Sequence, residues 1–171
     1  MKNCIVYSVL AVFIGLSCQP PSLAFNAILG ISSALLLSYV LTKYPITIKS
    51  GICFGFVLSA VQFHWVASVF KLFTENSSLV SLLFAVTMYF VASFQFGIFA
   101  FLYKKLGKVR WLSPTLHLPL AWAVAELVYP KFIPWSQGAT MIAVTPLIKI
   151  VDLGGLPLVT FMLFWLATLT T

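Results

Sequence analysis

The chain has 171 residues, of which 61% are apolar and only 8% are charged, whereas roughly 45–50% apolar and 25% charged is usual for a soluble domain. Ten basic and three acidic side chains cannot cover a water-soluble body of this size, so a soluble globular fold is excluded. The mean hydropathy of +1.08 indicates a membrane protein, and because one membrane helix takes about 20 residues, a single membrane domain accounts for the entire chain.

Apolar runs along the chain predict an all-α fold, a polytopic membrane bundle of about six transmembrane helices. The predicted spans are residues 4–17, 23–41, 50–70, 79–103, 116–129 and 153–171, of which the first and fifth are short. Residues 1–18 also resemble a secretory signal, but a second apolar span follows them, so we interpret them as the first helix. Within the third span, Gly51, Gly55 and Ser59 recur every four residues and predict the close approach of a neighbouring helix.

Residues 130–152 form the one long connection in this pattern. The stretch mixes Trp135, Gln137 and Gly138 with prolines and apolar residues, and it is too long for a simple turn. Irregular backbone at membrane depth has to be buried in protein or line a water-filled cavity. We therefore expect this segment to lie in, or dip into, the outer membrane interface.

The distribution of charge predicts the orientation of the chain. If the six spans alternate in direction, one membrane face carries seven basic residues and no acidic ones. These are Lys2, Lys43, Lys49, Lys104, Lys105, Lys108 and Arg110. The other face receives three lysines together with all three acids, so its formal charge is zero. The positive-inside rule then predicts that both termini are cytoplasmic. Because the basic residues lie between apolar runs, they indicate topology rather than binding to nucleic acid.

Few catalytic constellations are possible with two histidines, three cysteines and three carboxylates. No CxxC or HExxH spacing offers a metal site, and no GxSxG motif offers a serine nucleophile. We therefore expect no metal, no cofactor and no catalytic residue in this chain.

Two ionisable side chains fall inside predicted spans, where their cost in lipid marks them as candidate site residues. Glu126 lies near the outer end of the fifth span, four residues after Trp122, so both lie on one helix face. His64 lies about two-thirds of the way across the third span, next to Trp65. If the helices adjoin, these groups converge with Trp135 in the outer leaflet. The alternative is structural: a histidine hydrogen-bonded between helices, and tryptophans that anchor the chain at the interface.

The order of several short motifs is more specific than any one of them. The motifs are Leu23-Ala24-Phe25, Gly55-Phe56, His64-Trp65-Val66, Trp122 with Glu126, Pro134-Trp135-Ser136-Gln137, Pro146-Leu147 and Gly154. In this order and spacing the chain resembles the membrane half of the apolipoprotein N-acyltransferase family, over nearly its entire length. The candidate lipid- and substrate-contacting residues are then Glu126, Trp122, His64, Trp65, Pro134, Trp135 and Gln137.

The resemblance implies a multi-pass protein of the bacterial inner membrane. That family moves an acyl chain from a phospholipid donor to the N-terminal diacylglyceryl-cysteine of a lipoprotein, so phospholipid and lipoprotein are the implied partners. Its chemistry resides in a nitrilase-like domain, where a Glu-Lys-Cys set forms a thioester. No such domain is present here, so the resemblance implies a catalytically incomplete chain. The apolar end at Thr171 lacks a basic anchor and predicts a fragment, or a split or degenerate gene product.

A second function remains open from the sequence alone. A six-helix substrate-binding subunit of a small-molecule uptake transporter would match the length, with Gln62, His64 and Glu126 contacting the ligand. Intramembrane proteolysis is a weaker alternative, because the chain has neither a GxSG motif nor paired intramembrane aspartates.

Overall fold

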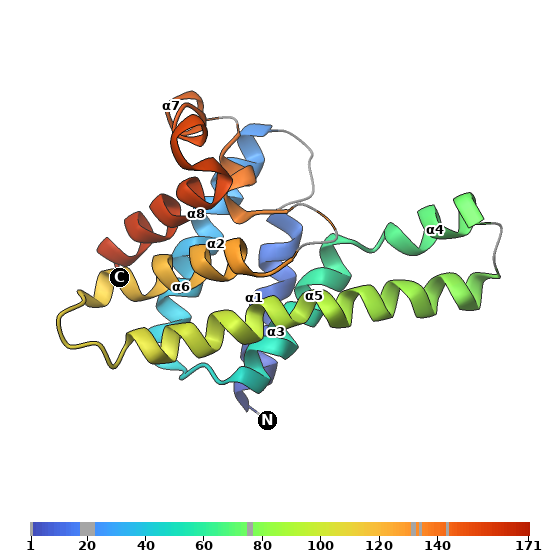
Figure 1. Cartoon of the computed structure of the whole chain (residues 1–171), viewed down its shortest axis with the longest axis horizontal. Helices are drawn as coiled ribbons and strands as arrows, with labels where there is room; N and C mark the ends of the chain where they lie inside the picture. The colour runs from blue at the N-terminus through green and yellow to red at the C-terminus, as the bar shows by residue number, and fades with distance from the viewer. Residues whose placement is uncertain (1, 18–22, 75–76, 131–132, 134, 143) are drawn as a thin grey trace.

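The computed structural model describes residues 2–17, 23–74, 77–130, 133, 135–142 and 144–171. Every regular element in these ranges is helical, which confirms the predicted all-α class. The helices are α1 (Lys2–Ser17), α2 (Leu23–Lys43), α3 (Ile48–Gln62), α4 (Val66–Thr74), α5 (Ser78–Leu106), α6 (Pro114–Val128), the 3₁₀ helix η1 (Gln137–Met141), α7 (Thr145–Ile148) and α8 (Val151–Leu169). Figure 1 shows them gathered into one bundle, from which α4 and the start of α5 project as an arm.

Helix length separates these elements into two groups. Within the described residues, α2, α5 and α8 are long and apolar enough to cross a membrane, and α3 with α4 makes a fourth crossing if the bent pair is one span. The helices α1 and α6 have 16 and 15 residues, fewer than the usual length of a membrane helix, about 20. Length and composition thus support three or four crossings, and the six-span path stays a prediction.

The predicted continuous span over residues 50–70 is broken in the structure. The helices α3 and α4 meet at an angle of 59°, and Phe63 at the break has the non-helical torsions φ −110° and ψ 25°. The Phe63 carbonyl accepts a hydrogen bond from the Val66 amide at 2.9 Å and another from the Tyr89 hydroxyl at 2.8 Å. A side chain of α5 therefore compensates for the helical hydrogen bonding that the break removes.

The small-residue stripe of α3 faces α5, as the sequence predicts. A Cβ atom on Gly51 would lie 2.5 Å from the Phe96 carbonyl oxygen, and one on Gly55 would lie 2.9 Å from the Ser93 Cα. Ser59, the third member, is buried. The absence of side-chain atoms is what lets these two backbones pack directly on one another.

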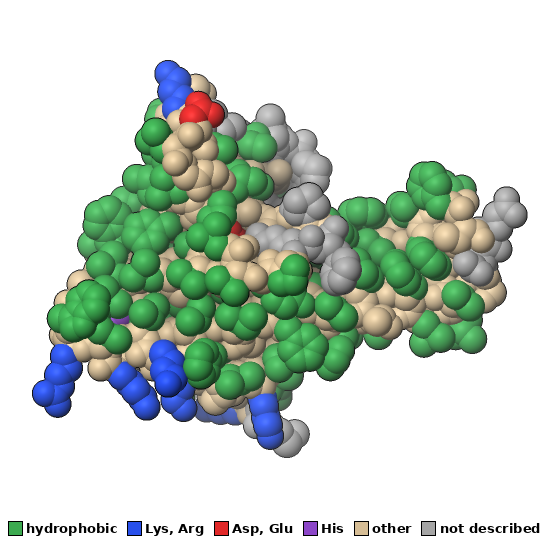
Figure 2. All heavy atoms as spheres, viewed as in Figure 1, with side chains coloured by type: hydrophobic (Ala, Val, Ile, Leu, Met, Phe, Trp, Pro, Cys, Tyr) green, Lys and Arg blue, Asp and Glu red, His purple; other side chains and the backbone are tan. Residues whose placement is uncertain are grey.

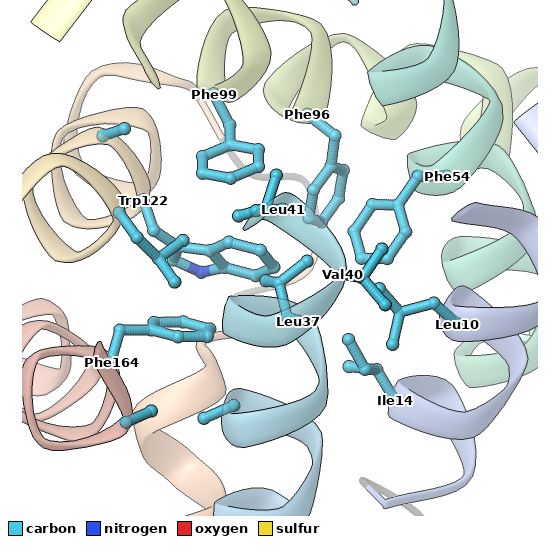
Figure 3. Close-up of a cluster of buried hydrophobic side chains, with 14 of the residues drawn as sticks. Leu10, Ile14, Leu37, Val40, Leu41, Phe54, Phe96, Phe99, Trp122 and Phe164 are labelled. Atoms are coloured by element: carbon cyan, nitrogen blue, oxygen red, sulfur yellow. The ribbon is translucent and has the colours of Figure 1, made fainter. Parts of the chain in front are cut away.

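An aromatic cluster joins this pair to the rest of the bundle. The Trp122 ring of α6 lies 4.7 Å from the Phe164 ring and 4.9 Å from the Phe99 ring between centroids, and 5.5 Å from that of Phe96. Figure 3 shows that aliphatic side chains of α1 and α2, including Leu10 and Leu37, point into the same cluster. The cluster fixes α6 and α8 against α5, which positions the polar groups described below.

Charge and apolar surface are segregated on the outside of the molecule. Figure 2 shows Lys and Arg side chains along one edge, and an acidic side chain beside a basic one at the opposite end. The arm carries exposed apolar side chains, among them Leu72 and Phe73, which are 77% and 79% exposed. Such a surface suits lipid, and the assignment of the basic edge to the cytoplasm stays a prediction.

Candidate functional site

Glu126 is the centre of a buried polar network between α6, α8 and the segment that follows α6. Its side chain is only 4% exposed. One carboxyl oxygen, Oε1, accepts hydrogen bonds from the Trp122 indole N–H at 3.0 Å and from the Gln137 backbone N–H at 3.1 Å. The other oxygen, Oε2, accepts from the Ser136 hydroxyl at 2.7 Å and from the Thr160 hydroxyl at 3.1 Å. Two obligatory donors thus share one oxygen, and two hydroxyls that can rotate share the other.

The segment held by this carboxyl group lies inside the bundle. Ser136 is 3% exposed and Gln137 is fully buried. The Gln137 side-chain amide donates a hydrogen bond to the Ser33 hydroxyl of α2 at 3.0 Å. The Ser33 hydroxyl in turn donates to the Gly30 carbonyl at 2.7 Å. Residues 130–152 were predicted to lie in or dip into the interface, and within them Ser136–Met141 enters the protein core. Protein partners for its backbone make that depth possible.

Two glycines, Gly138 and Gly30, leave room for the buried segment to pack against α8 and α2. A Cβ atom on Gly138 would lie 2.6 Å from the Leu156 carbonyl oxygen of α8, and one on Gly30 of α2 would lie 2.3 Å from the Thr140 hydroxyl oxygen. The Gly138 backbone N–H donates to the Thr160 hydroxyl at 2.8 Å. The start of α8 bends around the turn at Gly155, whose φ of 70° favours glycine.

A pocket opens beside the network, between α3, α4 and α5. Its cavity volume is about 40 Å³, and the free space in and around it, open surroundings included, is about 560 Å³. The lining is mostly apolar, and its members are Leu58, Ser59, Gln62, Phe63, Val66, Met88, Tyr89, Ala92, Gln95, Phe96, Tyr129, Ile133 and Trp135. Trp135 directly precedes the buried Ser136, so the position of this pocket wall depends on the Glu126 network.

One polar atom in the pocket wall has an unused hydrogen-bonding capacity. Gln62 is 7% exposed, and its Oε1 has no hydrogen-bond partner in the described part of the chain. An unpaired acceptor in such surroundings is costly unless a ligand or water supplies a donor. The pocket wall is therefore mostly apolar, with a buried glutamine side chain in it.

The predicted site residues separate into two sets. Glu126, Trp122 and Gln137 are joined by hydrogen bonds, and Trp135 lines the pocket next to them. His64 and Trp65 are exposed at the break between α3 and α4, where the His64 Nδ1 lies 3.0 Å from the Val61 carbonyl oxygen. Pro134 lies outside the described residues.

Three members of the network, Ser136, Thr160 and Ser33, could not be recognised in the sequence. Ser136 lies in a recognised motif, but nothing in the motif indicates that its hydroxyl contacts Glu126. Thr160 stands alone in an apolar run and Ser33 follows another serine, and a hydroxyl group in such a helix commonly bonds to its own backbone. Only the packing of α2, α6 and α8 brings them together. Within the described ranges, no group of three or more His, Cys, Asp or Glu side chains could hold a metal ion.

Comparison with known proteins identifies one family. The family model for the apolipoprotein N-acyltransferase N-terminal domain matches residues 10–169. No curated protein gives a match. The family match includes both the Glu126 network and the residues that line the pocket.

Proposed function

The chain belongs to the apolipoprotein N-acyltransferase N-terminal domain family, and on this premise we propose that it is the membrane portion of an enzyme that acylates lipoproteins. The donor is a phospholipid, and the acceptor is the diacylglyceryl-cysteine at the lipoprotein N-terminus. The protein is a multi-pass component of the bacterial inner membrane. The observation that carries this proposal is a family match extending over almost the entire chain. The transporter alternative is not retained, because no comparable observation supports it.

The pocket between α3, α4 and α5 is the proposed site for a lipid acyl chain. Apolar side chains from three helices, such as Leu58, Met88 and Ile133, form its wall, and an acyl chain gains close packing there. The pocket lies at the break of the α3–α4 pair, with Phe63 and Val66 in its lining.

Glu126 has a positioning role in this proposal. Both of its oxygens already accept hydrogen bonds from protein groups, and its side chain is buried. It therefore acts through Ser136 and Gln137, which hold the segment that contains Trp135 against the bundle. We therefore propose this positioning role for Glu126 in place of the direct lipid contact expected from the sequence. Trp122 and Gln137 are also buried, so we propose positioning roles for them as well.

We expect this chain alone to be catalytically incomplete. Cys4 lies on α1 and Cys53 lies on α3, and both are free thiols. A nucleophilic thiol needs a neighbouring base or cation that stabilises the thiolate. Glu126 cannot serve, since its oxygens are engaged in the network around α6 and α8. The acylating chemistry therefore belongs to a part of the enzyme outside these residues.

Photolabelling with a phospholipid tests the proposed acyl-chain site. The chain is placed in nanodiscs that contain a phospholipid with a diazirine in one acyl chain, illuminated, digested and analysed by mass spectrometry. We expect the peptides that contain residues 58–66 and 88–96 to be labelled more strongly than the exposed arm at residues 79–86. Ala92→Trp fills the pocket and is expected to reduce this labelling to the level of the arm, because the acyl chain and the indole compete for the same space.

Val86→Trp is the matched control, because Val86 is 40% exposed on the same helix and does not line the pocket. This variant is expected to keep the labelling of the pocket peptides. If Ala92→Trp fails to elute as a monodisperse protein, the smaller Ala92→Leu replaces it. Equal labelling of pocket and arm, or pocket labelling that survives both Ala92 variants, would reject the acyl-chain site.

A further inference from the structure

A second pocket lies at the other end of the α3–α5 pair. It forms where α3 begins and α5 ends, and it encloses about 970 Å³ of empty space including its open mouth. Its lining consists of Thr47, Ile48, Lys49, Ala100, Phe101, Lys104, Lys105 and Lys108. Lys105 is about 15 Å along α5 from Gln95 of the first pocket, at 1.5 Å per residue. The two pockets are therefore separate sites on the same pair of helices.

The second pocket carries strong positive charge. Four of its lining residues are lysines, all of them exposed, and none is acidic. Lys104 and Lys105 lie in the last turn of α5, and Lys108 lies in the turn that follows it. Like charges held this close repel one another, so a bound anion relieves an unfavourable arrangement.

The start of α3 adds to this attraction. Thr47 caps the helix by accepting a hydrogen bond from the Ser50 backbone N–H at 3.2 Å. The N–H groups of Ile48 and Lys49 lie in the first turn, where no carbonyl of the same helix can pair with them. These groups and the positive end of the helix dipole add to the attraction of the lysines for a phosphate group.

The pocket also has an apolar side, which distinguishes it from a site for a free anion. Ile48 and Phe101 are 51% and 47% exposed, and the Lys105 ammonium lies 5.5 Å from the centre of the Phe101 ring. A free phosphate would use the lysines alone. A phospholipid would use the lysines for its headgroup and the exposed apolar side chains for the first part of its acyl chains.

We propose that this pocket binds the phosphate-containing headgroup of an anionic phospholipid on the membrane face where the basic residues gather. The site is distinct from the acyl-chain pocket, and it does not depend on the proposed function. It gives the bundle an anchor in the leaflet that the basic residues face. Basic pockets between helices at a cytoplasmic membrane face have the same chemistry.

The test is a native mass spectrometry titration of the chain in detergent. Phosphatidylglycerol is compared with phosphatidylcholine, which carries the same phosphate but has no net charge. We expect tighter binding of phosphatidylglycerol in the wild type. The variant Lys104→Gln/Lys108→Gln is expected to lower that affinity about 25-fold, since each lysine near an anionic surface contributes about fivefold. Its binding of phosphatidylcholine should be unchanged.

A matched control removes the same charge outside the pocket. Lys43→Gln/Arg110→Gln neutralises two cations of the same predicted membrane face that do not line the pocket, and it is expected to retain most of the affinity for phosphatidylglycerol. Equal losses in both double variants would show diffuse surface charge and overturn the pocket. Equal binding of the two lipids would overturn the requirement for an anionic headgroup.

A soluble competitor separates lipid from free phosphate. Glycerol 3-phosphate in large excess is expected to leave phosphatidylglycerol bound, because it lacks acyl chains. Displacement of the lipid would identify a site for soluble phosphate compounds and overturn the proposal. If the double variant unfolds, the single variant Lys49→Gln on α3 replaces it. Its affinity for phosphatidylglycerol is expected to fall about fivefold.

Discussion

Replacing Glu126 with alanine is expected to destabilise the bundle by about 4 kcal/mol, because two obligatory donors each cost about 1–3 kcal/mol when left unpaired. Those donors are the Trp122 indole N–H and the Gln137 backbone N–H, both of which point at Oε1. Both donors belong to buried residues, since Trp122 is 2% exposed and Gln137 is 0% exposed. The measurement is thermal unfolding in detergent, followed by near-ultraviolet circular dichroism.

Glutamine at position 126 is expected to cost much less, about 1 kcal/mol. Its carbonyl oxygen can take the place of Oε1 and keep both obligatory donors. Its amide group then faces the Ser136 and Thr160 hydroxyls, which can rotate to accept instead of donating. Asp152→Asn is the control, since Asp152 is exposed at the start of α8 and its replacement is expected to change stability by no more than about 0.5 kcal/mol. Equal losses in the alanine and glutamine variants would contradict the division of donors between the two oxygens.

Trp122→Ala is expected to cost about 3 kcal/mol, the low end of the range for a buried aromatic residue. The substitution leaves a cavity among Phe96, Phe99 and Phe164. Because a lipid-like environment is as apolar as the core, the lost packing matters more than the transfer of the indole. The loss of its hydrogen bond to Glu126 adds to this cost.

Trp111→Ala is the matched control for the same measurement. Trp111 is 87% exposed, so its removal creates no internal cavity, and a change of no more than about 0.5 kcal/mol is expected. Similar unfolding midpoints for the two variants would show that the aromatic cluster does not hold α6 in place.

Much of the helical architecture could be predicted from the sequence, because apolar runs of membrane length have few alternatives to helix. The contact of α3 with α5 was also predictable, since Gly51 and Gly55 lie one turn apart. The break between α3 and α4 was not. Phe63, His64 and Trp65 contain neither proline nor glycine, and the break depends on a hydroxyl of Tyr89 that is remote in the sequence.

The candidate site was predictable only in part, for a similar reason. The spacing of Trp122 and Glu126 places both on one helix face, and their hydrogen bond agrees with it. The burial of Glu126 was not predictable, because its position near a predicted helix end suggested contact with water or lipid headgroups. Its donors Ser136 and Thr160 come from segments whose proximity is set by tertiary packing.

The central claim is that the Glu126 carboxyl group shapes the acyl-chain pocket by holding the segment that begins at Trp135. The most direct measurement is photolabelling of Glu126→Ala in nanodiscs, with the same diazirine phospholipid and with Glu126→Gln beside it. We predict that the folded alanine protein, which lacks the acceptor for the Gln137 N–H and the Ser136 hydroxyl, shows weaker labelling of residues 58–66 and 88–96, while the labelling of the exposed arm does not change and the glutamine variant labels like the wild type. Wild-type labelling of the pocket in a folded Glu126→Ala protein would contradict the claim.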